Sequence, residues 1–415
     1  MKSIIPTYII ILLLFSFGTT TAQTDLEIGW KHWENGDIHD AQSVTQEILK
    51  NEPANNEALH LKTLCLYVQG KYKESIETFS LIDTAYDEHE KLVKTIIEAY
   101  LHLNEPDNAY KFAKQFNMES VNYYRDRVDK PFTFNGDKTY IIPFVDDPLI
   151  PSKYMPGVSG KINGKEKHIL FDTGGPFLVI GKDLAEELGI KLEHEGTGMH
   201  GSDKVNTWRS IVDKLDLGNG LVFENVPVGI MESLGKLAIF GTNILEQFLS
   251  TIDYPNSRFI LTPRNRKELY KDHMALISEK QETLPFYIWG DHFMIGKGSF
   301  NNIDNLNFFF DSGLLVIDMI DGKPKQASFN LSKVKMIELG FDENKLDKSD
   351  LFQTKYTLSL KGLSQENTLI FYNAKLDKDR VFGGIRIDGL ISHAFLSKYS
   401  WTIDFDKQEY IFGID

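Results

Sequence analysis

The residues best suited to chemistry are two aspartates that stand in the same short motif. The motifs are Phe171-Asp172-Thr173-Gly174 and, further along the chain, Phe310-Asp311-Ser312-Gly313. Each one follows an apolar run, which predicts a buried strand that ends in a turn. One copy alone would be an ordinary strand-to-turn sequence. Two copies in matching contexts predict two carboxylates that face each other within one polypeptide.

Two facing carboxylates have a defined chemistry. At about 3 Å and an effective dielectric constant near 20 they repel each other by roughly 5 kcal/mol, equivalent to about four pKa units. Both cannot stay ionised near neutral pH, so the pair is expected to share one proton. The ionised member can then act as general base on a water molecule while the protonated member polarises a carbonyl group. Which of Asp172 and Asp311 holds the proton stays open, because the pair titrates as a unit.

The remaining motif residues follow from the same geometry. The hydroxyl groups of Thr173 and Ser312 can donate across to the facing backbone and hold the two loops in register. Gly174 and Gly313 let backbone N–H groups approach the carboxylates, which a Cβ atom would obstruct. We expect these four residues to support the aspartate pair.

The surroundings of the motifs are repeated as well. Ser250-Thr251-Ile252-Asp253-Tyr254 and Trp401-Thr402-Ile403-Asp404-Phe405 each lead, at equal spacing, into a second apolar run. These two segments are offset by 151, whereas the aspartate motifs are offset by 139. The second copy therefore holds 12 extra residues between its landmarks. We interpret the pattern as an internal duplication.

With these residues in view, the C-terminal two thirds of the chain resemble the aspartic peptidases, in their single-chain, two-lobed arrangement and with retropepsin-like detail. The resemblance is carried by both aspartate motifs, by the two Thr-Ile-Asp-aromatic segments and by Ile239-Phe240-Gly241. In that family an apolar pair followed by glycine underpins each catalytic turn, and the second copy here has Leu390-Ile391-Ser392. The resemblance implies an all-β pepsin- or retropepsin-like domain and an endopeptidase that uses no metal or organic cofactor.

The family also places a β-hairpin flap over the substrate. The best candidate lies between Glu195 and Val205, and its tip is Gly198, Met199 and His200. The same stretch contains the spelling G-x-G-x-x-G, but a dinucleotide site needs a strand before it and a helix after it. Here a helix over Lys182–Leu188, ended by Gly189, precedes it, and Thr207–Val212 follows as an expected strand. We therefore favour a flap, since glycine gives a moving hairpin a permissive turn.

Histidine indicates little by itself. His194 and His200 could join Glu193 and Glu195 in a metal cluster, but no H-E-x-x-H spacing supports it. We expect a solvated loop and no metal.

The residues that follow each motif bear on pH. Many acid-acting members of the family have a hydroxyl residue there, which keeps the ionised form charged. This chain has Gly175-Pro176 and Leu314-Leu315 instead. Losing such a donor should raise the pKa values of the pair, which favours an optimum nearer mild acid or neutrality.

The chain divides by composition. Lys2, the apolar run Tyr8–Phe17 and the small residues Thr20-Thr21-Ala22 indicate a secretory signal peptide. Gly36, Gly70 and Asn104 then recur at one constant interval, as do Ala41, Ser75 and Ala109, which resembles the tetratricopeptide repeat. We expect a signal peptide over residues 1–22, a helical repeat domain over 23–120, a linker over 121–137, and lobes over 138–270 and 271–415.

The net charge limits the kinds of partner, and the single cysteine limits what can stabilise the fold. The formal net charge is −14, which disfavours nucleic acid and anionic membranes as partners. No apolar segment reaches the roughly 20 residues that a membrane span needs. The single cysteine, Cys65, cannot pair within the chain, so apolar cores must stabilise the fold.

Together these features predict an exported aspartic endopeptidase, periplasmic or secreted, in which Asp172 and Asp311 activate water and cleave a peptide or protein substrate. The helical repeats would be either a spacer or a dock for a protein partner. The alternative is a catalytically weak protein that holds peptides in a protease-like cleft and recruits a partner through the repeats.

Overall fold

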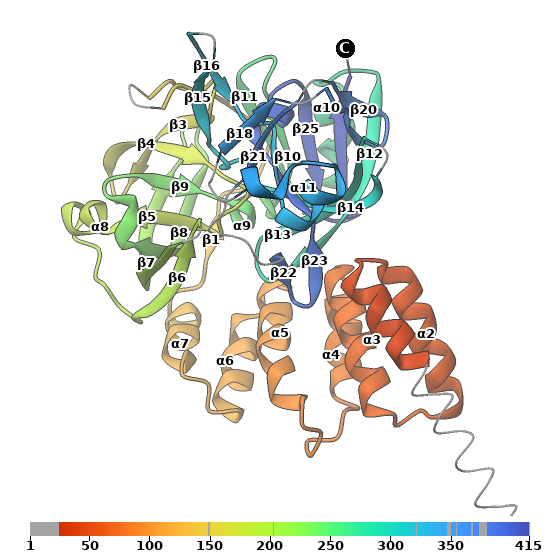
Figure 1. Cartoon of the computed structure of the whole chain (residues 1–415). Helices are drawn as coiled ribbons and strands as arrows, with labels where there is room; N and C mark the ends of the chain where they lie inside the picture. The colour runs from red at the N-terminus through yellow and green to blue at the C-terminus, as the bar shows by residue number, and fades with distance from the viewer. Residues whose placement is uncertain are drawn as a thin grey trace, which may run out of the picture.

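The computed structural model describes residues 25–147, 150–201, 203–301, 303–320, 322–346, 350–353, 355–366, 368–372 and 380–414. A helical domain is followed by two β-rich lobes that lie side by side (Figure 1). This order confirms the expected all-α repeat-like region and all-β, two-lobed region. The expected signal peptide, residues 1–22, lies outside the described residues.

The N-terminal domain is a row of antiparallel helices. Each helix packs on the next along the chain, from α2 to α7. Small buried residues, Ala41, Ser75 and Ala109, let neighbouring helices approach closely. The described part of the first helix covers residues 25–34, and the others are α2 (Ile38–Asn51), α3 (Asn56–Val68), α4 (Tyr72–Phe79), α5 (His89–His102), α6 (Pro106–Gln115) and α7 (Val121–Asp129).

The turns that recur at the repeat interval have a shared backbone geometry. Gly36, Gly70 and Asn104 have φ angles of 70°, 69° and 57°, in the left-handed region that favours glycine and asparagine. Two of these turns also lie against the second lobe. A Cβ atom on Gly36 would come within 2.5 Å of the Asn307 side chain, and one on Gly70 within 3.1 Å of Gln408. The period seen in the sequence therefore marks both helix turns and part of a domain contact.

The helical region runs further than the sequence indicated. Helix α7 occupies residues 121–129, which we expected to form part of a linker. Its Tyr124 is buried, so tertiary packing supports a helix there. The helix ends before Pro131, where the expected break does occur.

The first lobe is one sheet with two short helices. Helix α8 (Lys182–Leu188) ends at Gly189, whose φ of 71° caps it, as the sequence predicted. The expected strand Thr207–Val212 lies within β7. Helix α9 is Thr242–Leu245. The strand order is β1 (Thr133–Phe134), β8 (Val222–Met231), β5 (Leu178–Gly181), β9 (Ala238–Phe240), β4 (Lys165–Phe171), β3 (Gly157–Ile162), β7 (Asp203–Asp216) and β6 (Gly196–His200).

A second, larger sheet forms the other lobe and continues into the first. The lobe itself contains β18 (Asp350–Gln353), β21 (Leu369–Tyr372), β17 (Phe329–Leu331), β24 (Gly389–Ile391), β14 (Ile303–Phe310) and β13 (Phe293–Phe300). Strands β19 (Leu358–Leu360) and β20 (Leu363–Gln365) extend it, and α11 (Lys333–Glu338) covers part of it. The bridging strands are β12 (Gln281–Trp289), β26 (Glu409–Gly413), β25 (Ser400–Asp404), β10 (Phe248–Asp253), β11 (Arg258–Pro263) and β2 (Tyr140–Pro143).

The pairing of the bridging strands reflects the internal duplication. Strands β10 and β25 are the repeated Thr-Ile-Asp segments, and they pair antiparallel with Thr251 opposite Thr402. The two threonine hydroxyl groups lie 2.6 Å apart and are fully buried. Equivalent residues of the two copies thus meet at the junction of the lobes.

The extra residues of the second copy have a definite location. Strand β5 begins at Leu178, shortly after Asp172, whereas its counterpart β17 begins only at Phe329, much further beyond Asp311. The added length forms a separate hairpin of β15 (Ile317–Ile320) and β16 (Lys323–Gln326). From β17 onward the two copies keep their larger offset, so the insertion lies directly after the second aspartate motif.

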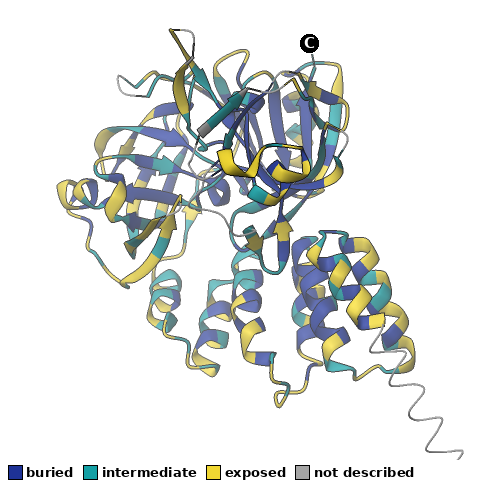
Figure 2. Cartoon of the chain, in the orientation of Figure 1, coloured by how far each residue is buried: buried dark blue, intermediate teal, exposed yellow. Residues whose placement is uncertain are grey.

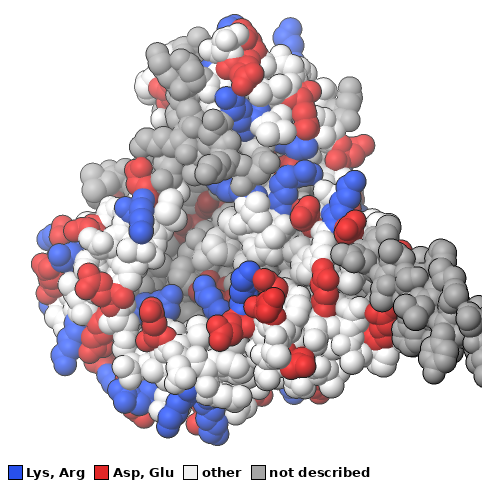
Figure 3. All heavy atoms as spheres, turned by 60° about the horizontal axis from the view of Figure 1, so that its bottom comes forward, with Lys and Arg blue, Asp and Glu red and all other residues white. Residues whose placement is uncertain are grey.

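Burial and charge follow this architecture. Buried residues fill the strands of both lobes and line the facing sides of the helices, while α11 and the β15–β16 hairpin are largely exposed (Figure 2). On the face drawn in Figure 3, basic and acidic side chains are interspersed, so its described part carries no continuous basic patch of the kind that binds nucleic acid. Among the described helices, none combines the length and apolar character that crossing a membrane requires.

Candidate active site

Equivalent strands of the two copies present the two aspartates. Strand β4 ends in buried Phe171 and β14 ends in buried Phe310, and each leads straight into an aspartate. Each strand pairs in parallel with the apolar pair of its own lobe, β4 with β9 and β14 with β24. The Asp172 N–H donates to the Phe240 carbonyl at 3.1 Å, and the Asp311 N–H donates to the Ile391 carbonyl at 2.9 Å. The sheet therefore fixes where each turn begins.

Hydroxyl groups tie the two turns together across the lobe junction. Thr173 Oγ1 donates to the Phe310 carbonyl at 2.7 Å and accepts from the Ser312 N–H at 3.0 Å. Ser312 Oγ in turn accepts from the Thr173 N–H at 2.9 Å. Both side chains are buried, so these bonds are shielded from water. Thr173 and Ser312 therefore link the two turns across the lobe junction.

The structure brings the two carboxyl groups into direct contact. Asp172 and Asp311 lie close enough for each to act on the pKa of the other, and both residues are half-buried. Asp172 Oδ1 accepts from the N–H groups of Gly174 at 2.6 Å and Gly313 at 2.9 Å. The Gly313 N–H also reaches Asp311 Oδ1 at 3.1 Å. The Gly313 N–H group thus donates to one carboxylate from each lobe.

The motif glycines are required by this close approach. A Cβ atom on Gly174 would lie 2.6 Å from Asp311 Oδ1, and one on Gly313 would overlap the Asp172 carboxylate. Any larger residue at either position would push the facing carboxyl away. Glycine is needed here for space.

Burial and proximity shift both carboxyl groups in the same direction. Burial raises the pKa of Asp172, against which the two glycine N–H bonds and the nearby His292 act to lower it. Burial and the charge of Asp172 raise the pKa of Asp311 well above its usual range, and Arg380 opposes this shift. The hydrogen bonds on Asp172 favour its ionised form. The arrangement suits a pair that holds one proton near neutral pH.

Ser392 of the second copy takes the place that Gly241 has in the first. At Gly241, its counterpart, a Cβ atom would overlap the carbonyl oxygens of Gly175 and Pro176. In the second lobe the chain returns to this place only after the β15–β16 hairpin. The Ser392 N–H still donates to a carbonyl at 3.0 Å, as the Gly241 N–H does, and its hydroxyl group donates to the Ala327 carbonyl.

The candidate flap is a hairpin in the structure. Strands β6 and β7 pair with Gly198 opposite Val205 and Met199 opposite Lys204. The Met199 side chain is 60% exposed, so it is free to contact another molecule. His200 is held through Nδ1 by the Ser233 hydroxyl group at 2.8 Å.

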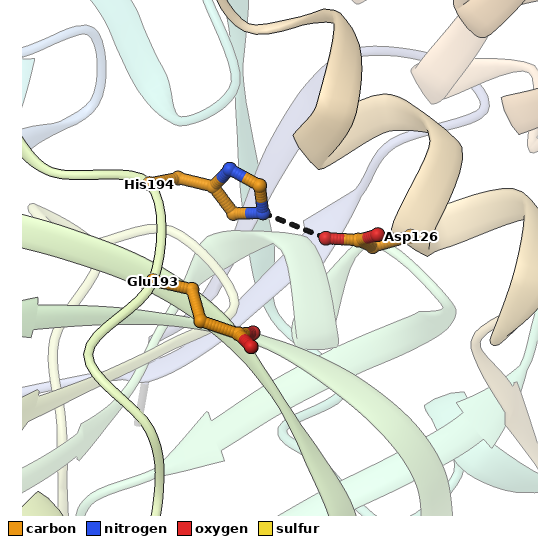
Figure 4. A group of neighbouring side chains, drawn as sticks. All are labelled: Asp126, Glu193 and His194. Atoms are coloured by element: carbon orange, nitrogen blue, oxygen red, sulfur yellow. Dashed lines mark hydrogen bonds and ion pairs between the residues drawn. The ribbon is translucent and has the colours of Figure 1, made fainter.

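The metal cluster considered from the sequence is not the group of side chains that the structure brings together. Glu193 and His194 meet Asp126 of helix α7 (Figure 4). His194 Nε2 lies 2.6 Å from Asp126 Oδ2, while His200 bonds elsewhere. We interpret the Asp126–His194 contact as a link between the helical domain and the first lobe. The sequence could not reveal it, because the partners lie far apart along the chain in different domains.

Two residues that act on the pair were not foreseen. Arg380, in β22 (Arg380–Phe382), acts electrostatically on Asp311, and His292, after the β12 strand, acts on Asp172. Neither residue belongs to a motif, so only the folded chain brings them near the aspartates.

Comparisons with known proteins agree with part of this assignment. Residues 158–244 match the family model described as aspartyl protease. The match confirms the resemblance to aspartic peptidases for the first copy, which contains Asp172, and it ends before the copy that contains Asp311. A search of curated proteins gave no match. A solved retropepsin-like aspartic protease from Rickettsia conorii is similar at 20% identity and a TM-score of 0.25, over 30% of this chain and 99% of that one.

Proposed function

We propose that this protein is an aspartic endopeptidase that hydrolyses peptide bonds with a water molecule activated between Asp172 and Asp311. The observation that carries the proposal is the contact between two carboxyl groups from equivalent turns of two lobes. A contact of this kind has little structural value, because burying two acids together is costly. The contact between the carboxyl groups is explained if their shared proton takes part in catalysis.

The reaction follows from the charge state of the pair. The ionised carboxylate, favoured at Asp172, takes a proton from water while the water oxygen bonds to the carbonyl carbon of the substrate. The protonated Asp311 gives its proton to the carbonyl oxygen, so no unbalanced charge develops. The C–N bond then breaks as the amine nitrogen receives the proton held by Asp172, while Asp311 takes a proton back from one hydroxyl group of the intermediate as the acid product forms. The aspartates end in their starting charge state.

The same environment bears on pH. Burial raises the pKa of both carboxyl groups, and Gly175 and Leu314 supply no side-chain hydroxyl to oppose it. We expect a bell-shaped rate profile with its maximum at mildly acidic or neutral pH. A maximum below about pH 3 would contradict this reasoning.

Digestion of a denatured protein tests the assignment. The full chain, Asp172→Asn and Asp311→Asn are compared by mass spectrometry of the products. Asp87→Asn, a carboxyl change on an exposed helical loop, is the matched control. We expect each dyad variant to lose about 100-fold or more of the rate and the control to keep it. Unchanged cleavage in both dyad variants would end the assignment.

The alternative is that the protein is weakly catalytic, holds peptides and recruits a partner through its helices. The contact between the carboxyl groups supports catalysis over this rival. The rival predicts peptide binding without turnover by the unmodified chain, so the same digestion separates the two.

We also propose that the chain is exported, to the periplasm or beyond the cell. The support is the Lys2 start, the apolar run Tyr8–Phe17 and the small residues Thr20-Thr21-Ala22. N-terminal sequencing of the protein from fractionated cells is expected to begin at Gln23. An intact N-terminus in the cytoplasmic fraction would refute export.

A further inference from the structure

Arg380 enters the candidate active site from a small hairpin of its own. Strand β22 pairs with β23 (Ile385–Ile387), with Arg380 opposite Ile387. Further along the strand, the Phe382 ring packs on Phe293 at 4.3 Å and on Phe309 at 5.4 Å between ring centroids. Phe309 lies near the end of β14, just before Asp311. The hairpin is therefore anchored beside the strand that presents the second aspartate.

The turn of this hairpin, directly after Phe382, is also held in place. The Gly383 carbonyl accepts a hydrogen bond from Trp33 Nε1 of the helical domain at 3.0 Å. A Cβ atom on Gly383 would overlap the Trp289 ring, and one on Gly384 would lie 2.7 Å from Trp33 Nε1. These contacts hold the turn of the hairpin, and at its open end Arg380 pairs with buried Ile387. The position of Arg380 is thus set by the fold.

The guanidinium group of Arg380 lacks partners in the described part of the chain. Its Nη1 atom is buried and has no hydrogen-bond acceptor there. Within the described residues, no carboxylate forms an ion pair with Arg380 at 4.0 Å or less, and Asp311 is the acid whose charge acts on it. The two aspartates do not satisfy the guanidinium group, because no hydrogen bond joins either of them to Arg380 among the described residues. A buried guanidinium N–H without an acceptor is costly unless a ligand supplies one.

A carboxylate is the ligand that fits best. The guanidinium group presents parallel N–H donors that match the two oxygens of a carboxylate, and such bonds are about twice as strong as neutral ones. The water-activating pair lies close by, so a bound carboxylate would belong to a residue next to the bond that is cut. A neutral amide of the same shape would offer one acceptor and no charge.

We propose that Arg380 is a specificity-determining residue that binds the carboxylate of a substrate aspartate or glutamate beside the scissile bond. This inference rests on the proposed peptidase function. It makes the enzyme selective for acidic sites in proteins, although the surface of the chain is itself acidic overall.

The first test needs no variant at Arg380. The residues around every cut in a denatured-protein digest are counted, and only cuts that disappear in Asp172→Asn are kept. We expect aspartate and glutamate to be enriched at one position next to the cut. Cuts that depend on Asp172 but show no acidic enrichment would overturn the inference and leave the peptidase assignment intact. If no cut depends on Asp172, the proposed function fails and the inference fails with it.

The second test measures kcat/KM for paired synthetic peptides that differ only by glutamate or glutamine at that position. The unmodified enzyme should prefer glutamate by about 10- to 100-fold. Arg380→Gln should bring the ratio close to one, mainly by slowing the glutamate peptide. Arg386→Gln removes an arginine from the partner strand, where its side chain is 44% exposed, and should keep the preference.

Two results would contradict the role of Arg380. One is a glutamate preference that survives in Arg380→Gln. The other is an equal loss for both peptides together with a displaced pH–rate profile, which would mean that Arg380 acts only on the charge of the dyad. Should Arg380→Gln fail to fold, Arg380→Lys keeps the charge but loses the paired donors, and it should reduce the preference without abolishing it.

Discussion

A buried ion pair between the helical domain and the lobes makes stability depend on pH in a defined way. His102, the last residue of α5, lies 2.8 Å through Nδ1 from Glu246, which follows α9. Its Nε2 atom lies 2.9 Å from the Gly290 carbonyl, and its ring stacks on Tyr72 at 4.5 Å. The side chains of the pair are only 3% and 7% exposed. Solvent therefore screens this contact little.

The size of the effect follows from the histidine pKa. Burial lowers the pKa of His102, but the charge and hydrogen bond of Glu246, the Gly290 carbonyl and the charge of Glu98 outweigh burial and raise it from 6.5 to about 9. The folded chain holds this proton more tightly than the unfolded chain does. The stabilisation is fully present below pH 6.5 and is lost as the pH rises through about 9. The difference corresponds to about 3 kcal/mol.

Urea unfolding at pH 6.5 and pH 9.5 measures this difference. Tryptophan fluorescence is a suitable signal, because Trp33 and Trp289 meet at the same domain contact, 6.2 Å apart. We expect the unmodified chain to lose about 3 kcal/mol of unfolding free energy between the two pH values. His102→Gln should be less stable by about 3 to 5 kcal/mol at pH 6.5, because buried Glu246 loses its ion-pair partner.

The control is His39→Gln, which changes an exposed histidine of the same domain. It should keep the pH dependence of the unmodified chain, whereas His102→Gln should lose most of it. If stability does not fall between pH 6.5 and 9.5, or if His102→Gln shows the same fall, the reasoning about this ion pair is wrong.

Three further changes probe the turns themselves. Gly313→Ala should reduce kcat by about 100-fold or more, because its methyl group would displace the facing carboxylate, while Gly175→Ala has 3.7 Å of space and should keep the rate within a few fold. Thr173→Ala should lower the unfolding free energy by about 1 to 3 kcal/mol by leaving a buried carbonyl and N–H group unpaired, and Thr173→Ser should restore most of it. Asp311→Asn should unfold with a weaker pH dependence above pH 4. The raised pKa of this half-buried acid means that the unmodified chain loses stability as the pH rises through that pKa, and an amide does not titrate. Equal effects of Gly313→Ala and Gly175→Ala, of the two Thr173 variants, or identical pH slopes for Asp311→Asn and the unmodified chain would each contradict the respective reasoning.

The aspartate pair could be predicted from the sequence because each half of it is local. A strand and the turn that follows it are adjacent in sequence, and the duplication implies that equivalent turns face each other. The difference between the two repeat offsets also indicated an insertion in the second copy. In the structure this insertion is the β15–β16 hairpin, which lies between Gly313 and Phe329. The sequence did not show where along the second copy this insertion lies.

Other features depend on contacts between distant segments. Arg380 lies in no motif and comes near Asp311 only because aromatic packing fixes its hairpin. Helix α7 was expected to be linker because prolines follow it, although a buried tyrosine holds it in place. Asp126 joins His194 across a domain boundary, which no local pattern reports.

The proposed mechanism requires the two aspartates to act as one unit. Single-turnover rates on the best peptide, measured for the unmodified chain, Asp172→Asn, Asp311→Asn and the double variant, test this directly. Each single change should remove nearly all of the rate, and the double change should cost no more than the worse single one, because half a dyad is as inactive as none. Losses that multiply in the double variant, or a single variant that keeps much of the rate, would show that the carboxyl groups act separately.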